Sequence, residues 1–526
     1  MPRVLIADEV SEVAVQAFAE RGIEVSVRPG LAPAALAEFI GDYEGLVVRS
    51  ATRVTPDLLS QAIRLKVIGR AGTGVDNVDI DAATKRGIVV MNTPHGNSVT
   101  AAEHTIAMMC ALARRIPQAD RSTRKGSWER GRFMGVELRD KTLGVVGCGT
   151  IGAIVATLAQ GLRMRVIAFD PYLAPDRAAS LGVTLATMDE LLNDADVITL
   201  HVPLTDETRG IIDADALART RPGVRIVNCA RGGLVVEADL LSAIESGHVA
   251  GAALDVFEEE PAQEDNPLFA LDEVIATPHL GASTVEAQEN VAHQIAQQMA
   301  EYLLTGTVLN AVNTPSVAPE DLAKLGPYLT LAEQIGSFAG QIAEGRIRGV
   351  TVAYEGQASA LDSRLLTAAA LQGLLAPRLD NINIVNAPFI ARERGIEVRE
   401  VKSATTADYQ TLMRVEVLSQ DQPQAVAGTL IGRGGRRIVE VEGIEVEAEL
   451  GPHMLYFTNE DRPGLIGGVA TILGEAGINI ATFNLGRREP GGDAIGLIGV
   501  DSVVPDDVVE KLRARAAVID LKRLNF

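Results

Sequence analysis

The sequence predicts an α/β protein with three or four domains. Its first half alternates short apolar strands with helices, which is typical of parallel sheets. Near residue 147 a glycine-rich turn separates a strand from a helix, and the next strand ends in a carboxylate. The 526 residues are also too many for one hydrophobic core. We therefore expect several α/β domains in succession, one of them built on a doubly wound parallel sheet.

The first segment, residues 1–96, is expected to form a small parallel α/β domain. Helical stretches separate its short apolar strands. The expected strands cover residues 3–7, 24–27, 45–48, 67–69 and 88–91. A helix over residues 99–115 then leads into the next domain.

The glycine-rich turn has the spacing of a dinucleotide-binding loop. Gly147 allows a tight turn, Gly149 leaves room for a pyrophosphate beside the backbone, and Gly152 lets the helix pack close to the strand. Asp170 follows Gly152 by 18 residues, the distance at which a carboxylate holds a ribose diol. Its charge would repel a 2′-phosphate. The unit therefore predicts a Rossmann-type domain that binds NAD rather than NADP.

Further strands continue this sheet, and a long helix then returns the chain toward its beginning. The strands are expected at residues 197–201, 224–228, 250–255 and 274–276, and the helix at 284–304. A closing segment at 309–313 makes the first domain discontinuous. Residues 313–320 are expected to form a linker.

The C-terminal part divides into two α/β regions. Residues 320–450 have strand-rich ends. From His453 the order strand, helix, strand, strand, helix, strand predicts a ferredoxin-like unit. Its elements are expected at residues 454–458, 464–475, 478–485, 494–500, 506–515 and 518–521, with a turn at 459–463.

Charge and cysteine content narrow the functional classes. The net charge of −21 argues against nucleic acid or an anionic membrane as a main partner. The cysteines Cys110, Cys148 and Cys229 lie far apart without metal-ligand spacing, so we expect neither disulfides nor a metal. No apolar run is long enough for a signal peptide or a membrane span, so a cytoplasmic location is expected.

Several motifs in the sequence resemble those of a known protein family, and the resemblance covers essentially the whole chain. They are Gly69–Asp79, Asn92–Ser98, the glycine loop, Asn228–Gly233, Ala253–Phe257 with Glu260-Pro261, and Thr277–Thr284. By these motifs the chain resembles the D-isomer-specific 2-hydroxyacid dehydrogenases, and among them the long-form D-3-phosphoglycerate dehydrogenases.

The resemblance implies an arrangement of four domains. Residues 1–96 and 286–315 would form a flavodoxin-like substrate domain, into which the Rossmann-type NAD-binding domain of residues 97–285 is inserted. Residues 316–451 would form an intervening domain and residues 452–526 a regulatory ACT domain.

The family places an arginine, a glutamate and a histidine over the nicotinamide, and the matching residues are Arg231, Glu260 and His279. Histidine titrates in the range that proton transfer to and from a hydroxyl group requires. Glu260 would hold the second imidazole nitrogen, and the planar fork of Arg231 would grip the substrate carboxylate. Glu260 belongs to a run of three glutamates, of which it alone precedes the proline.

The resemblance also implies residues that bind the cofactor and the substrate. Those for NAD are Thr73, Gly147, Gly149, Thr150, Ile151, Gly152, Asp170, Val202, Cys229, Ala230, Asp255 and Gly281. Those for a phosphorylated hydroxy acid are Arg49, Ser50, Arg70, Gly74, Val75 and Arg130. The N–H groups of Gly74 and Val75 would form an anion nest, and Arg130 would reach the neighbouring subunit.

In the ACT-like unit, Asn459, Asp461 and Asn479 are candidates for binding an amino-acid effector between two chains, and L-serine is the family's usual effector. The family carries an aromatic residue where Asn459 stands. A plain turn at Asp461 and a cap at Asn479 explain the same residues without a ligand.

Together these observations predict NAD-dependent oxidation of 3-phospho-D-glycerate to 3-phosphohydroxypyruvate, the first step of the phosphorylated route to L-serine. Two alternatives remain: a dehydrogenase of another D-2-hydroxy acid, and an NAD-sensing corepressor-like protein. We expect a homo-oligomer, either a dimer or a tetramer.

Overall fold

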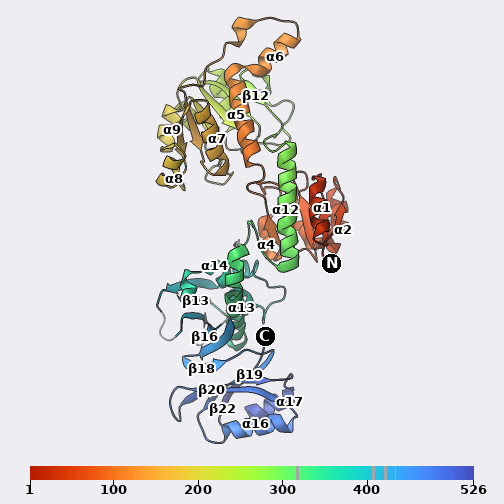
Figure 1. Ribbon diagram of the computed structural model, residues 1–526, viewed down its shortest axis with the longest axis vertical. Coiled ribbons are helices and arrows are strands. Elements are labelled where there is room, and N and C mark those ends of the chain that lie inside the picture. Colours follow the sequence, from red (N-terminus) through yellow and green to blue (C-terminus); the bar gives the residue numbers. More distant parts are fainter. Residues whose placement is uncertain (316–318, 406–408, 420–422, 433) are drawn as a thin grey trace.

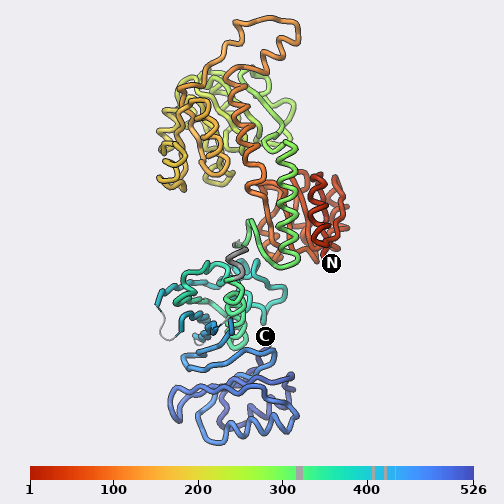
Figure 2. The backbone as a smooth tube through the Cα atoms, viewed as in Figure 1, coloured from red at the N-terminus to blue at the C-terminus, as the bar shows by residue number. Residues whose placement is uncertain are grey.

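Four sheets follow one another along the chain and give an elongated molecule (Figure 1). The structure is a computed structural model that describes residues 1–315, 319–405, 409–419, 423–432 and 434–526. The domain limit expected at residue 316, and with it part of the expected linker, lies outside the described residues. The chain passes from the first sheet to the second, returns to the first, and then continues through the third and fourth (Figure 2).

The first sheet is parallel throughout and has the strand order β2-β1-β3-β4-β5 of a flavodoxin-like fold. Its strands are β1 (Arg3–Ile6), β2 (Glu24–Val27), β3 (Gly45–Val48), β4 (Val67–Arg70) and β5 (Val89–Met91). Its helices are α1 (Glu12–Glu20), α2 (Pro33–Phe39), α3 (Pro56–Gln61) and α4 (Ile80–Lys85). The central strands are buried on both faces, which explains their nearly continuous apolar sequence.

The second sheet is also parallel, with the order β12-β11-β10-β9-β6-β7-β8. Its strands are β6 (Thr142–Val146), β7 (Arg165–Phe169), β8 (Thr184–Leu185), β9 (Val197–Leu200), β10 (Val224–Asn228), β11 (Val249–Leu254) and β12 (Val274–Ala276). Its longer helices are α5 (Ser98–Arg114), α6 (Ile116–Arg124), α7 (Thr150–Gly161), α8 (Pro175–Ser180), α9 (Met188–Asp194), α10 (Ala214–Ala218) and α11 (Glu237–Glu245). The strand order reverses between β6 and β9, as in a doubly wound Rossmann-type sheet. The exposed two-residue strand β8 was not expected, because it has no buried apolar run.

Two helices join these domains: α5, and α12 (Val285–Thr305), which runs back to the first sheet (Figure 1). A Cβ on Gly69 of β4 would lie 2.1 Å from the sulfur of Met299, so the glycine allows α12 to pack directly on that strand. Beyond α12, Asn313 accepts a hydrogen bond from the Val90 backbone at 2.9 Å. The second domain is thus inserted into the first.

The third sheet is mixed, with the order β14-β13-β15-β16-β17-β18. Its strands are β13 (Gly349–Gly356), β14 (Glu397–Ser403), β15 (Thr411–Leu418), β16 (Pro423–Ile431), β17 (Gly435–Val441) and β18 (Ile444–Ala448). Its helices are α13 (Pro319–Ile342), α14 (Ser363–Leu375) and α15 (Ala387–Glu393). Helices α13 and α14 pack very closely, since a Cβ on Gly336 would lie 2.0 Å from the backbone oxygen of Ala370.

The fourth sheet is antiparallel, with the order β20-β21-β19-β22, and confirms the ferredoxin-like unit. Its strands are β19 (His453–Glu460), β20 (Ile480–Arg487), β21 (Asp493–Val500) and β22 (Val518–Asn525), and its helices are α16 (Leu465–Glu475) and α17 (Asp506–Arg513). The expected turn at 459–463 begins too early. Asn459 still belongs to β19, because it pairs with Ala494 and Val518 on the two neighbouring strands.

None of the described helices combines the length and the hydropathy that a bilayer crossing requires.

Candidate active site

A cavity of about 880 Å³ lies between the first two domains. The carboxyl ends of β3 and β4 form one wall, and the loops after β11 and β12 form the other, as expected for ligand sites of parallel sheets. Six of the residues singled out in the sequence line it: Arg49, Ser50, Arg70, Asp255, Glu260 and His279.

His279 and Glu260 form a close pair in this cavity. His279 follows β12 and Glu260 follows β11, and Nδ1 of the histidine lies 2.8 Å from Oε2 of the glutamate. The Phe257 N–H donates to the other carboxylate oxygen at 3.2 Å. Burial raises the pKa of Glu260, but the hydrogen bond and charge of His279, with the Phe257 N–H, hold it below the ordinary value. Glu260 therefore remains ionised and orients the imidazole.

The backbone of His279 is held in an uncommon conformation. Its φ is 55°, in the left-handed region that residues other than glycine seldom adopt. Its N–H donates to the backbone oxygen of Asp255 at 2.9 Å and to that of Thr277 at 3.0 Å. These contacts turn the histidine toward the cavity.

Arg231 extends from the loop after β10 to the first domain. Its Nε donates to Asp76 at 3.0 Å, and its Nη2 lies so close to Gly74 that a Cβ there would be only 2.0 Å away. The Asn228 side chain shapes this loop by donating to the Arg231 backbone oxygen at 2.8 Å. The structure thus brings Arg231 to the Gly74–Val75 loop. The ion pair with Asp76 was missed, although Asp76 lies within the Gly69–Asp79 motif.

Arg70 is a desolvated cation at the end of β4. Burial, followed by the nearby charge of Arg231, lowers the pKa of its guanidinium to about 10. Its Nε has no hydrogen-bond partner among the described residues. Gly72 makes room for it, because a Cβ there would lie 1.6 Å from Nη1 of Arg70. A half-buried guanidinium with an unused donor is suited to an anionic ligand.

The loop that carries Arg49 and Ser50 is held by Asp8, whose role sequence analysis did not anticipate. One carboxylate oxygen of Asp8 accepts the backbone N–H groups of Arg49 at 2.6 Å and Thr52 at 3.2 Å. Asp8 directly follows the apolar run of β1. A carboxylate at the carboxyl end of a buried parallel strand was the sequence feature that could have indicated this role.

The glycine loop has the shape that a dinucleotide requires. Gly147 has a φ of 88°, and a Cβ on Gly152 would lie 2.1 Å from the Gly147 backbone oxygen. A Cβ on Gly149 would meet nothing within 4 Å, so the space before Thr150 and Ile151 at the start of α7 is open for phosphate. The loop therefore fits the pyrophosphate of NAD.

Asp170 and Val202 flank this loop. The Cys148 N–H donates to Oδ2 of Asp170 at 2.9 Å, and the Tyr172 N–H donates to Oδ1 at 2.9 Å. Val202 lies against the turn, because a Cβ on Gly147 would be 2.7 Å from its side chain. The carboxylate of Asp170 thus lies beside the glycine loop, and its contact with the adenosine ribose of NAD stays a prediction.

The remaining residues expected to bind NAD lie in loops outside the helices and strands. Thr73 donates to the Asn97 side chain at 2.6 Å, and the Ala230 N–H donates to the Asn228 side chain at 3.1 Å. The Gly281 N–H donates to Asp255 at 2.9 Å.

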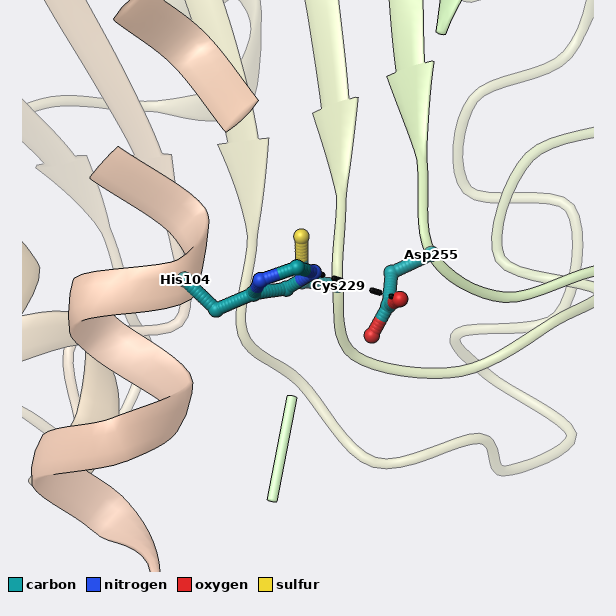
Figure 3. A group of neighbouring side chains, drawn as sticks. All are labelled: His104, Cys229 and Asp255. Atoms are coloured by element: carbon teal, nitrogen blue, oxygen red, sulfur yellow. Dashed lines mark ion pairs between the residues drawn. The ribbon is translucent and has the colours of Figure 1, made fainter. Parts of the chain in front are cut away.

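Among the described residues, one group of three side chains offers potential metal ligands: His104, Cys229 and Asp255, with ligand atoms within 4.8 Å of one another (Figure 3). Burial, followed by the charge of Asp255, raises the pKa of Cys229 to about 12, so its thiol is protonated. Three protein hydrogen-bond donors already occupy the Asp255 carboxylate. We interpret the group as a hydrogen-bonded cluster.

Arg130 does not reach the cleft within this chain. It lies on the exposed arm after α6, with its guanidinium 5.8 Å from the ring centre of Trp128. Any contact with substrate requires a second copy of the chain.

The three candidate effector residues each bond to their own neighbours. Asn459 is buried, and its amide donates to the Glu460 backbone oxygen at 2.8 Å. Asp461 accepts the Arg487 guanidinium at 2.9 Å and the Gly491 N–H at 3.1 Å. Asn479 donates to Asp501 at 2.7 Å.

Comparison with family models divides the chain into three matched segments. Residues 106–281 match the D-isomer specific 2-hydroxyacid dehydrogenase NAD binding domain. Residues 324–442 match the D-3-phosphoglycerate dehydrogenase intervening domain, and residues 453–517 match the ACT domain.

Curated relatives are similar over the full length. The chain is 43% identical to D-3-phosphoglycerate dehydrogenase of Bacillus subtilis (strain 168), covering 100% of both chains. It is 44% identical to the protein of that name from Archaeoglobus fulgidus, covering 98% of this chain and 99% of the relative.

Solved structures are similar to about three fifths of the chain. TT0316 protein from Thermus thermophilus is 34% identical, with a TM-score of 0.55 over 59% of this chain and 99% of that one. D-Lactate dehydrogenase from Aquifex aeolicus, solved with NAD and lactic acid, is 28% identical, with a TM-score of 0.53 over 60% of this chain and 100% of that one.

Proposed function

Because the chain belongs to the D-3-phosphoglycerate dehydrogenases, we propose that it oxidises 3-phospho-D-glycerate to 3-phosphohydroxypyruvate with NAD. It is an NAD-dependent oxidoreductase whose reaction begins the phosphorylated route to L-serine. The observation that carries this conclusion is the His279–Glu260 pair, 2.8 Å apart in a cleft lined by arginines.

His279 is the proposed acid–base group. Glu260 occupies its Nδ1, which leaves Nε2 to take the proton of the substrate hydroxyl. Glu260 stabilises the imidazolium that forms, and bound NAD supplies the hydride acceptor. In the reverse direction the imidazolium returns the proton to the carbonyl oxygen.

The substrate is held by positive charge and by backbone N–H groups. We assign its carboxylate to Arg231 with the Gly74–Val75 nest, since these groups already lie together. Arg49, Ser50 and Arg70 bind the remaining charge of the phosphorylated acid. The second assignment is supported by the cavity that Arg49, Ser50 and Arg70 line together and by the unused Nε donor of Arg70.

NADH formation from a panel of hydroxy acids tests this proposal. Absorbance at the NADH band should rise with 3-phosphoglycerate and much less with glycerate or lactate, because the arginines match an acid with two anionic groups, a carboxylate and a phosphate. Equal rates with glycerate would favour the alternative of another D-2-hydroxy acid. Binding of NAD without turnover of any acid would favour the corepressor-like alternative. Full-length similarity to D-3-phosphoglycerate dehydrogenases supports oxidation of 3-phosphoglycerate over these two alternatives.

We also propose that paired ACT domains bind L-serine through Asn459, Asp461 and Asn479. The Asn459 Oδ1 is buried without a hydrogen-bond partner among the described residues, which supports a ligand there. Millimolar L-serine should lower the rate of NADH formation, and Asp461→Asn should weaken that inhibition. Glu489→Gln in the same domain is the control. An unaltered rate at every serine concentration would rule out serine feedback.

We propose that the chain has four domains, at 1–96 with 286–315, 97–285, 316–451 and 452–526. The proposal is supported by the four sheets of the described residues, one of which falls in each range. A dimer or tetramer is supported by Trp128 and Met134, which are 75% and 80% exposed on the arm. Light scattering after gel filtration measures this, and a monomer would contradict it. The three free cysteines support a cytoplasmic location.

A further inference from the structure

The buried carboxylate of Asp255 holds the loop that carries His279. Its side chain is fully buried at the end of β11. Oδ1 accepts the Thr277 hydroxyl at 2.5 Å and the Leu280 N–H at 2.8 Å, and Oδ2 accepts the Gly281 N–H at 2.9 Å. With the bond from the His279 N–H to its backbone oxygen, Asp255 fixes the chain on both sides of the histidine.

This carboxylate faces a histidine from another element. His104 lies on α5, one of the two helices that join the domains, and its Nε2 is 3.2 Å from Oδ1 of Asp255 (Figure 3). Burial raises the pKa of Asp255, but the hydrogen bond from His104, with those from Thr277 and Leu280, brings it below the ordinary value. An ionised carboxylate without water needs such a partner.

Three further described side chains lie near Asp255, those of Cys229, Glu260 and Thr277, and none of the three is a cation. Cys229, in the loop after β10, carries a protonated thiol because its pKa is raised to about 12. Glu260, in the loop after β11, is ionised, because against the effect of burial His279 and the Phe257 N–H hold its pKa below the ordinary value. Thr277 is neutral. His104 offers its Nε2 to Oδ1 of Asp255 at 3.2 Å, so it can hold this carboxylate by a hydrogen bond from a separate helix.

We propose that His104 is a positioning residue that acts through Asp255 to keep the His279–Gly281 loop in its catalytic conformation. A protonated Asp255 would carry an O–H where it now accepts a backbone N–H, so the loop would lose a contact beside His279. The inference rests on the catalytic role proposed for His279. It assigns His104 no contact with the reacting atoms.

Two substitutions separate this role from simple packing. His104→Leu removes the partner, so the pKa of Asp255 rises and the active, ionised form is lost at a higher pH than in the wild type. We expect kcat to fall about tenfold, which corresponds to the loss of one hydrogen bond to a charged group. The acid limb of the kcat profile should move to higher pH, and KM for 3-phosphoglycerate should stay nearly unchanged. His104→Gln retains an N–H donor and should recover most of the activity. His248→Leu is the matched control, since His248 contacts the Thr220 hydroxyl at 3.1 Å and does not line the cleft.

A wild-type pH profile in His104→Leu would overturn the proposal, and so would equal losses in the Leu and Gln variants. If His104→Leu does not fold, nitrogen NMR of the wild-type protein can test the proposal, because it shows which imidazole nitrogen of His104 carries a proton. An Nε2-protonated His104 supports the proposal, and a deprotonated Nε2 overturns it. Failure of the proposed function looks different, because the wild-type protein would then form no NADH from 3-phosphoglycerate. Failure of the acid–base role of His279 would instead leave full turnover in His279→Ala.

Discussion

Three consecutive glutamates have different surroundings, although their sequence is uniform. The Glu258 side chain accepts the Glu237 N–H at 3.0 Å, and Glu259 contacts Gln263 at 3.2 Å. Glu260 alone turns into the cleft to meet His279. The role of a single residue here depends on the partner that the fold brings to it.

Replacing His279 with alanine should lower kcat about 10²- to 10⁴-fold, because the group that takes the hydroxyl proton is lost. NADH binding, measured by fluorescence titration, should persist, since the glycine loop lies elsewhere. His293→Ala, an exposed histidine on α12, is the control. Unchanged turnover in His279→Ala would exclude the acid–base role.

Asp255→Asn should show a pH-dependent loss of stability. The pKa of Asp255 is lowered in the folded protein, so its carboxylate stabilises the fold above the unfolded-state pKa near 4. That contribution is lost as the pH falls through the lower, folded-state pKa. Urea denaturation should therefore find the variant about 1–3 kcal/mol less stable at pH 7, and the difference should shrink on acidification. A difference that is constant from pH 7 to pH 3 would contradict this account.

At the scale of elements, glycines set how closely the loops of the cleft approach one another. A Cβ on Gly232 would lie 1.7 Å from the Phe257 backbone oxygen, so the loops after β10 and β11 touch there. Gly72 and Gly74 similarly make room for Arg70 and Arg231. These loops carry the proposed catalytic and substrate-binding groups. They can approach one another this closely because glycine has no side chain.

Gly72→Ala tests this spacing. Gly72 has a φ of 147°, and the added methyl group would displace the Arg70 guanidinium. We expect KM for 3-phosphoglycerate to rise about tenfold or more, which corresponds to the loss of one charge-assisted contact, while the Kd for NADH stays unchanged. Gly30→Ala is the control, because Gly30 also has a positive φ, 73°, but nothing lies within 4 Å of its added Cβ. Equal effects in both variants would point to backbone strain alone.

At the scale of the whole molecule, the intervening and ACT domains share one hydrophobic core. Tyr456 of β19 packs edge-on against Phe338 of α13, with ring centres 5.6 Å apart, and the C-terminal Phe526 lies 6.2 Å from the same ring. Gln341 and Asn525 exchange hydrogen bonds at 2.9 Å. The two domains therefore pack around one continuous core, and they lie below the first two domains in Figure 1.

Calorimetry should show the intervening and ACT domains unfolding in one transition. Phe338→Ala should lower the Tm of that transition, since truncating a fully buried phenylalanine costs about 3–5 kcal/mol. Phe18→Ala, at an equally buried position in the first domain, should lower the other transition instead. Separate melting of the ACT domain in Phe338→Ala would contradict the shared core.

Most strands and helices could be predicted from the sequence, because their patterns are local. The apolar runs of β1 to β5 and the glycine turn before α7 each lie within a few residues. The end of β19 was missed because Asn459 and Glu460 look like a turn, and pairing with β21 and β22 extends the strand. Exposed β8 has no apolar signal at all.

By itself the sequence determined the four-part α/β organisation, the dinucleotide loop and the residue types of the cleft. Only the tertiary structure decided which of them meet. Arg231 pairs with Asp76 across 155 positions of the chain, and His104 reaches Asp255 from a separate helix. Local patterns encode backbone conformation, whereas such contacts depend on how distant elements pack, which no short window of sequence contains.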